Sequence, residues 1–217
     1  MRRLAGHASA AGIAVLLAMA AGSGVAAQEL PDAPDIRMAW TESHAPRPAS
    51  YAEALARWKT VDDIARHAGA AFVYDRARAL SLAESSTAAG ATRRPAIHAP
   101  ESFYAKPQGV CLDLARFGVE TLDRIDPSAH ARYLMLEFEP VVVEGAVLRR
   151  HWIASFQRDG AWWFFADSRR PGHVTGPYST IEAFVAEYAA YRGRPIVAYR
   201  ERDSLLRETR RVAQRKT

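Results

Sequence analysis

The chain has very little cysteine and very little lysine. Its 217 residues include one cysteine, Cys111, and three lysines, Lys59, Lys106 and Lys216. A single cysteine excludes an intramolecular disulfide and a metal site built from several thiolates. No two histidines have the spacing of a helical or finger-type metal site, and no glycine-rich phosphate loop is present. We therefore expect no metal site and no nucleotide-binding loop.

The positive charge is modest and comes almost entirely from arginine. The formal net charge is +5, and residues 200–217 carry seven positive and three negative side chains. This balance does not indicate a nucleic-acid partner, and the C-terminal segment is typical of a solvated basic tail. An anionic partner in the cell envelope stays open as an alternative.

The N-terminus has the pattern of a secretory signal peptide. Arg2 and Arg3 precede an apolar run that is densest over residues 13–20, and the small residues Val25-Ala26-Ala27 follow. This order predicts cleavage after residue 27 and export to a periplasmic or extracellular space. No later segment approaches the roughly 20 apolar residues that a membrane span requires. We expect a single domain with no stable membrane span after cleavage.

Hydrophobic periodicity predicts the organisation of the remaining chain. Residues 28–50 are rich in proline and polar residues and predict a flexible arm, residues 51–199 form one domain, and residues 200–217 form the tail. Helices are predicted over 51–68, 75–84, 112–125 and 180–191, strands over 133–143, 149–156, 161–167 and 196–199, and a long loop over 85–109. Helices followed by a mostly antiparallel sheet indicate an α+β fold.

Cys111 stands at the junction between the Pro/Gly-rich loop and a predicted helix. Unpaired backbone N–H groups and the helix dipole favour a thiolate at a helix start. The same N–H groups can hold an oxyanion during acyl transfer. Cys111 is therefore a candidate nucleophile, with a buried structural cysteine as the alternative.

His151 is the histidine best placed to act as a base, because it lies within a predicted strand beside Trp152. Its relation to Asp167 depends on the hairpin turn between the two strands. A three-residue loop, residues 158–160, places His151 opposite Asp167 on one face of the sheet. A two-residue turn places His151 opposite Ser168 and sends Asp167 to the other face. The catalytic interpretation needs the three-residue loop.

Three motifs resemble those of the bacterial transglutaminase-like family. Gly109-Val110-Cys111-x-Asp113-x-Ala115 is similar to its cysteine motif, His151-Trp152-Ile153 to its histidine strand, and Trp163-x-x-x-Asp167-Ser168 to its aspartate strand. The chain order agrees, with separations of 40 and 16 residues. The resemblance covers roughly residues 51–199.

This resemblance implies a papain-like core in which the cysteine helix packs on the sheet, and a Cys111-His151-Asp167 triad. Cys111 would attack an amide or ester carbonyl, His151 would pair with the thiolate and protonate the leaving amine, and Asp167 would orient His151. The implied activity is that of an exported peptidase or amidase acting on a protein or peptide in the cell envelope.

The candidates for the rest of the site come from their proximity in the chain. Gln108 and Tyr104 are candidates for the second oxyanion donor, and Trp152 is a candidate for the substrate cleft. Some relatives bind calcium through acidic residues beside the cysteine, but Cys111 has Val110 and Leu112 as neighbours. We expect no cofactor, with calcium at Asp113 as the alternative.

Two other functions remain open at this level. The first is a catalytically silent domain that binds a peptide or an envelope polymer in the same cleft. The second is an unrelated Cys-His enzyme of the cell-wall peptidase kind, which also places its cysteine at a helix start.

Overall fold

The computed structural model describes residues 30, 33–34, 47–85, 95–165 and 169–205. The predicted signal peptide, most of the arm and most of the tail lie outside these residues. Within them the chain forms an α+β structure in which helices cover an antiparallel sheet, as predicted. In the described ranges no helix is long and apolar enough to cross a membrane.

The main sheet has the strand order β7-β6-β5-β4-β8, and every pairing along it is antiparallel. Its strands are β4 (Arg132–Val143), β5 (Ala146–Arg158), β6 (Ala161–Phe165), β7 (Val174–Tyr178) and β8 (Ile196–Arg202). The short strand β2 (Glu84–Ser85) adds to β5. A second, parallel pair joins β1 (Val73–Tyr74) to β3 (Gln108–Gly109).

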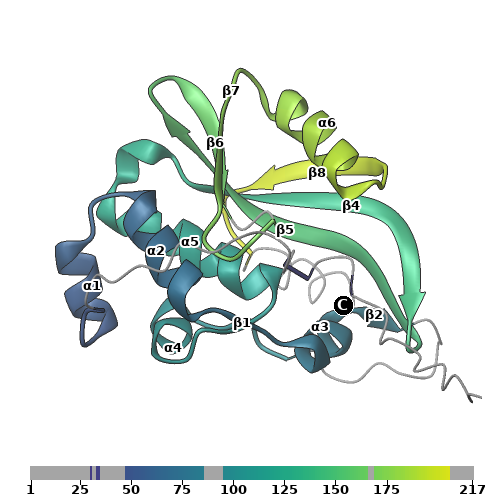
Figure 1. Cartoon of the computed structure of the whole chain (residues 1–217), viewed down its shortest axis with the longest axis horizontal. Helices are drawn as coiled ribbons and strands as arrows, with labels where there is room; N and C mark the ends of the chain where they lie inside the picture. Colours follow the sequence, from purple (N-terminus) through teal and green to yellow (C-terminus); the bar gives the residue numbers. More distant parts are fainter. Residues whose placement is uncertain (1–29, 31–32, 35–46, 86–94, 166–168, 206–217) are drawn as a thin grey trace, which may run out of the picture.

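Helices lie on both faces of the main sheet (Figure 1). We call the face that packs on α5 the inner face and the face covered by α6 the outer face. The inner layer contains α1 (Tyr51–Arg57), α2 (Val61–Ala71), α3 (Arg76–Leu82), α4 (Pro100–Ala105) and α5 (Cys111–Ile125). The outer layer is α6 (Ile181–Arg192), and a short 3-10 turn (Pro127–Ala129) follows α5.

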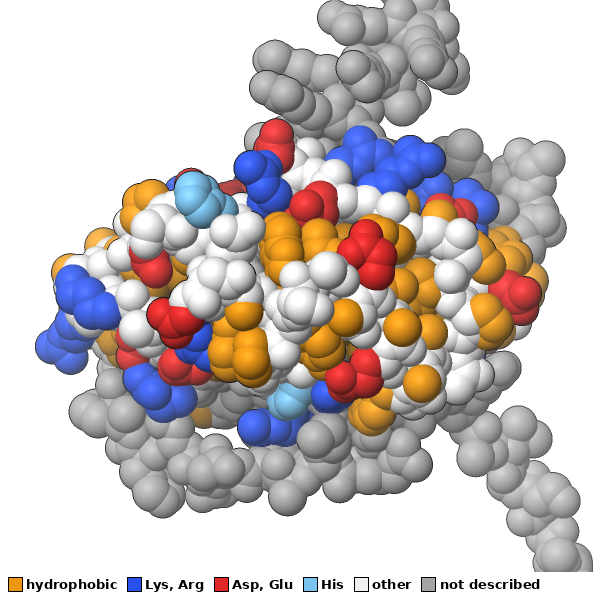
Figure 2. Space-filling view, turned by 90° about the horizontal axis from the view of Figure 1, so that it is seen from above, with side chains coloured by type: hydrophobic (Ala, Val, Ile, Leu, Met, Phe, Trp, Pro, Cys, Tyr) orange, Lys and Arg blue, Asp and Glu red, His pale blue; other side chains and the backbone are white. Residues whose placement is uncertain are grey.

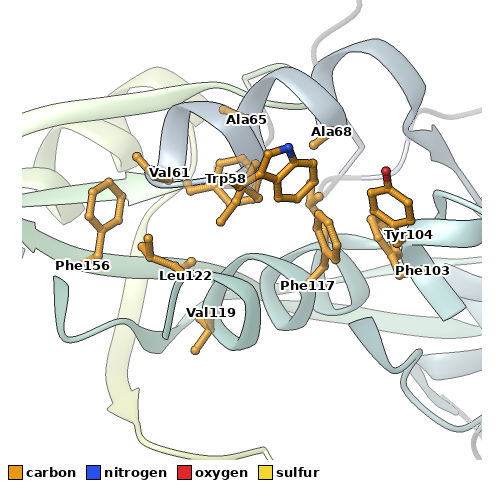
Figure 3. Packing of buried hydrophobic residues seen from close by; sticks show 14 of the residues in the cluster. Trp58, Val61, Ala65, Ala68, Phe103, Tyr104, Phe117, Val119, Leu122 and Phe156 are labelled. Carbon is orange, nitrogen blue, oxygen red and sulfur yellow. The ribbon is translucent and has the colours of Figure 1, made fainter. Parts of the chain in front are cut away.

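The alternation of side chains along β5 supplies residues to a separate core on each face. Ala154 and Phe156 belong to the inner core with Phe117 of α5, whereas Ile153 belongs to the outer core with Phe184 of α6. Successive residues of a strand point to opposite faces, so odd-numbered positions of this stretch face outward. Figure 3 shows Trp58, Phe117 and other inner-core side chains packed between α2 and α5.

The outer side of the molecule is chemically mixed. Seen from the α6 side, acidic and basic side chains lie among apolar ones, without a single-sign field over the whole face (Figure 2). This agrees with the modest net charge of the chain.

The predicted helix over 51–68 is two helices. α1 ends at Arg57 and α2 begins at Val61, because Asp63 Oδ2 accepts hydrogen bonds from the backbone N–H groups of Lys59 (2.9 Å) and Thr60 (3.1 Å). Such side-chain caps satisfy the N–H groups that a helix start leaves unpaired. Both helices bury residues of the predicted apolar face. The hydrophobic pattern therefore continues across the break between them and does not reveal it.

The predicted loop over 85–109 also contains structure. Its described part holds α4, which begins at Pro100, and β3, which pairs with β1. Both elements are too short for periodicity to reveal. Strand β7 was not predicted either, since Gly176 and Pro177 interrupt it.

The ends of the predicted domain need adjustment. β8 runs to Arg202, so the first residues of the predicted tail belong to the sheet. In the predicted arm, Leu30 is 3% exposed within a core cluster that includes Val143, and the Pro48 carbonyl accepts the Tyr104 hydroxyl hydrogen bond (2.6 Å). The described part of the arm is therefore packed on the domain.

Candidate functional site at the start of α5

Cys111 is the first residue of α5, as its sequence context predicts. The preceding residue, Val110, has an extended backbone (φ −123°, ψ −179°) and caps the helix. Cys111 is buried, with 8% of its surface exposed. The thiol therefore lies in the first turn of a 15-residue helix, where the helix dipole favours negative charge.

The side of α5 that carries Cys111 faces the inner side of the sheet. A Cβ built on Gly118 would lie 2.7 Å from the ring of Phe165 and 3.7 Å from Ala154, so Gly118 points at β5 and β6. Cys111 is seven residues earlier, which is two helical turns along the same stripe. Val110 packs in a cluster with Val143 and Leu148, which lie where β4 ends and β5 begins.

The buried carboxylate of Asp113 organises the first turn. Its Oδ2 accepts hydrogen bonds from Val110 N (3.1 Å) and Arg78 Nε (2.7 Å), and its Oδ1 accepts from Arg78 Nη2 (2.8 Å) and His98 N (2.8 Å). Asp113 has no exposed surface, and the Arg78 side chain is 11% exposed. Burial raises the pKa of the carboxyl, but Arg78 and the two backbone donors outweigh it and hold the pKa below its ordinary value.

The segment before Cys111 is held by backbone contacts with β1 and with Asp75, the residue that caps α3. Asp75 N donates to Gly109 O (2.8 Å), and Val73 N donates to Pro107 O (2.8 Å). Gly109 leaves room for the cap, since a Cβ at this position would lie 2.7 Å from Asp113 Oδ2. The close approach of the Asp113 carboxylate to the backbone of Gly109 thus explains both the glycine and the aspartate of the cysteine motif.

His151 lies on β5 opposite Leu136, as part of the regular pairing of β4 with β5. It is 2% exposed, and its ring stacks on that of Tyr188 from α6, with 5.9 Å between ring centroids. Leu136 belongs to the same outer core as Tyr188. The structure thus places the His151 ring on the outer face, whereas the Cys111 side of α5 addresses the inner face.

The hairpin between β5 and β6 has the two-residue turn. Arg158 pairs with Ala161, and the turn residues Asp159 and Gly160 have φ of 54° and 74°. The described pairs run from Arg158–Ala161 to Ala154–Phe165, and this register excludes the three-residue loop that the catalytic interpretation needs. Left-handed angles at both positions give a turn whose twist matches the strands. Asp167 itself lies outside the described residues.

The other predicted site residues have separate positions. Gln108 precedes Cys111 by three residues, and its Nε2 donates to Asp75 Oδ2 (3.0 Å). Tyr104 is 3% exposed in the inner core and its hydroxyl donates to Pro48 O, so we do not propose it as an oxyanion donor. Trp152 is half-buried against the inner core, on the face that Cys111 addresses. Its role in a substrate cleft stays a prediction.

Arg78 is the site residue that the sequence did not reveal. Asp113 lies in the first turn of the helix predicted over 112–125, and a carboxylate that is buried there requires a partner. The pattern could not say which arginine meets this requirement, because Arg78 is 35 positions away on a different helix.

The carboxylate of Asp113 is not arranged for calcium. Each of its oxygens accepts two hydrogen bonds from protein donors, including both Arg78 contacts. A calcium ligand needs lone pairs directed at the ion. Within the described ranges, no group of three or more His, Cys, Asp or Glu side chains could hold a metal ion.

The chain was compared with models of known protein families and with curated proteins, and it matches none of them. The class that the fold defines is therefore an α+β domain with a cysteine helix on an antiparallel sheet. The transglutaminase-like resemblance of the three motifs stays a prediction.

Proposed function

We propose that the protein is a thiol acyl-transfer enzyme, a peptidase or amidase with a transglutaminase-like, papain-like core. The observation that carries this proposal is the place of Cys111. The sole cysteine of the chain is the first residue of a long helix, on the side of that helix that faces the sheet.

In the proposed reaction the Cys111 thiolate attacks a carbonyl carbon and forms a thioester as the amine leaves. His151 gives the amine its proton. The two-residue turn removes the register that would have set Asp167 opposite His151, so we propose no orienting role for Asp167. Water then attacks the thioester, which releases the acid and returns the thiol. Backbone N–H groups at the helix start stabilise the oxyanion in both steps.

This proposal makes a definite demand on His151. Its side chain must leave Tyr188 and come to the inner face, where Cys111 lies, and this requires β5 to shift its pairing with β4 by one residue or to detach from it. A second candidate function follows from the observed position: a silent domain that binds a peptide or an envelope polymer, in which His151 is part of the outer core.

The discriminating experiment is alkylation of Cys111 by iodoacetamide across pH. The proposed pair predicts a thiol that titrates well below about 8.5, the value of free cysteine, and that loses this property in His151→Ala. The control is His130→Asn, because His130 is exposed with φ of 47°, an angle that asparagine accepts.

Each outcome decides between the candidates. A lowered thiol pKa that depends on His151 supports the pair. A lowered pKa that is unchanged in His151→Ala removes His151 from the site. A thiol that is inert in the folded protein and reacts only after unfolding overturns the enzyme and favours the silent domain.

We also propose that the enzyme acts outside the cytoplasm, because of the signal-peptide pattern of residues 1–27. The mature protein would begin at Gln28. Mass spectrometry of the protein expressed with its native N-terminus in a bacterial host checks this. An intact Met1 on the purified protein would contradict export by cleavage.

A further inference from the structure

The first turn of α5 contains a buried charge pair that the proposed chemistry does not use. Asp113 is fully buried two residues after Cys111, and Arg78 reaches it from α3 through two hydrogen bonds. Arg78 Nη2 also donates to Ala96 O (2.6 Å). The pair thus joins α3, the segment before α4 and the start of the cysteine helix.

The two partners have different effects on the thiol. Asp113 Oδ2 accepts a hydrogen bond from the backbone N–H of Val110, and this contact fixes where the helix begins. Its negative charge alone, however, would oppose a second negative charge in the same turn. Arg78 cancels that charge while it holds the carboxylate in place.

We propose that Arg78 and Asp113 are positioning residues for Cys111: Asp113 fixes the first turn of α5, and Arg78 neutralises the carboxylate so that the thiol can ionise. This inference rests on the proposed role of Cys111 as the nucleophile. Neither residue need touch the substrate.

Other titratable groups bear on the thiol of Cys111. Asp75 caps α3 and donates its backbone N–H to Gly109 O, and His98 lies beside Asp113, with 3.9 Å between His98 Nδ1 and Asp113 Oδ1. His151 lies on the outer face of β5 and enters only through the proposed pair with Cys111. The proposed variants leave all three in place. Changes in the thiol can then be assigned to the pair.

A purely structural cap and a charge-balancing pair give different results. Loss of a cap disturbs the first turn in the same way whichever partner is removed. Charge balance predicts opposite effects: Arg78→Gln leaves a buried anion and raises the pKa of the thiol, whereas Asp113→Asn leaves a cation and lowers it. We expect shifts of about one unit.

The measurement uses the single cysteine of the chain. Cysteine labelled with ¹³C at Cβ gives one NMR signal, and its shift against pH reports the thiol pKa without any substrate. Arg76→Gln is the matched control, since Arg76 is on the same helix and pairs with the exposed Glu144 (2.8 Å). That variant should leave the titration unchanged. If Arg78→Gln fails to fold, Arg78→Lys keeps the charge and should keep the thiol pKa while Arg78→Lys/Asp113→Asn lowers it.

The results separate this inference from the proposed function. Opposite shifts in the two variants support the pair even if the wild-type thiol titrates near 8.5, a value that would count against the enzyme. A low wild-type thiol pKa that neither variant moves, or that both move in one direction, overturns the pair and leaves the enzyme standing.

Discussion

At the scale of single residues, the described structure separates what local sequence predicts from what distant contacts decide. Cys111 at a helix start followed from the Pro/Gly break and the apolar pattern after it. The partner of Asp113 did not follow, because Arg78 is brought to it by the packing of α3. Gly109 is explained only by the approach of Asp113. A motif can thus indicate that a residue matters before it reveals the contact responsible.

His67 is a second residue whose environment could not be predicted. Its apolar neighbours come from three separate segments: it stacks on Tyr104 at 4.5 Å between centroids, and Trp58 and Phe117 lie at 5.5 and 5.6 Å. His67 is 7% exposed, and its Nε2 has no hydrogen-bond partner among the described residues. Burial, together with the charge of Arg47, lowers the pKa of His67 from 6.5 to about 4.

This lowered pKa predicts a loss of stability in mild acid. The folded state disfavours the proton that the unfolded state accepts below pH 6.5, so the free energy of unfolding falls as the pH drops from about 6.5 towards 4. We expect a decrease of about 2 kcal/mol between pH 7.5 and pH 5 from this group. Urea unfolding at the two pH values measures it.

The control variants make the origin of this loss clear. His67→Leu should flatten the dependence between pH 7.5 and 5, and the exposed His130→Asn should keep it. The lowered pKa of Asp113 acts in a more acidic window, since a carboxyl depressed below 3.8 is still ionised at pH 5. An undiminished pH dependence in His67→Leu would contradict the prediction.

At the scale of elements, the hairpin between β5 and β6 decides which side chains share a face. The sequence left two turns open, and the structure has the two-residue turn with left-handed angles at Asp159 and Gly160. The two turns differ in length by one residue. That difference shifts the register of β6 and moves each of its side chains to the other face of the sheet. Composition alone could not settle it, because Arg158-Asp159-Gly160 suits both turns.

The turn also carries a stability prediction. A Cβ at Gly160 meets nothing within 4 Å, so Gly160→Ala changes only the backbone, which has φ of 74°. We expect the free energy of unfolding to fall by about 1 kcal/mol. Gly160→Asn is the matched comparison and should cost less, because asparagine visits the left-handed region more readily. Equal losses for the two variants, measured by urea unfolding, would show that backbone conformation is not the cause.

At the scale of the whole molecule, one sheet is shared by two helical layers. Phe117 lies in the inner core and Phe184 in the outer core, and both are fully buried. The ring of Phe184 stacks on that of Phe164, with 3.7 Å between centroids. The α+β order of the elements predicted this arrangement only in outline. Which face His151 occupies follows from the pairing of β5 with β4, which the sequence did not specify.

Because both cores are built on the same strands, we expect the described domain to unfold as one unit. Phe117→Ala and Phe184→Ala should each lower the free energy of unfolding by about 3–5 kcal/mol, a large share of the roughly 5–15 kcal/mol of a typical domain. The exposed Val197→Ala, at a position 58% exposed, should change it by less than about 0.5 kcal/mol.

Far-ultraviolet circular dichroism and tryptophan fluorescence should give coincident transitions in all three variants. If the two transitions of Phe184→Ala instead failed to coincide, the outer layer would be a separate cooperative unit. His151 could then leave Tyr188 without unfolding the cysteine helix, which is the first movement that the proposed Cys111-His151 pair requires. The second is a change in the pairing of β5 that brings His151 to the inner face.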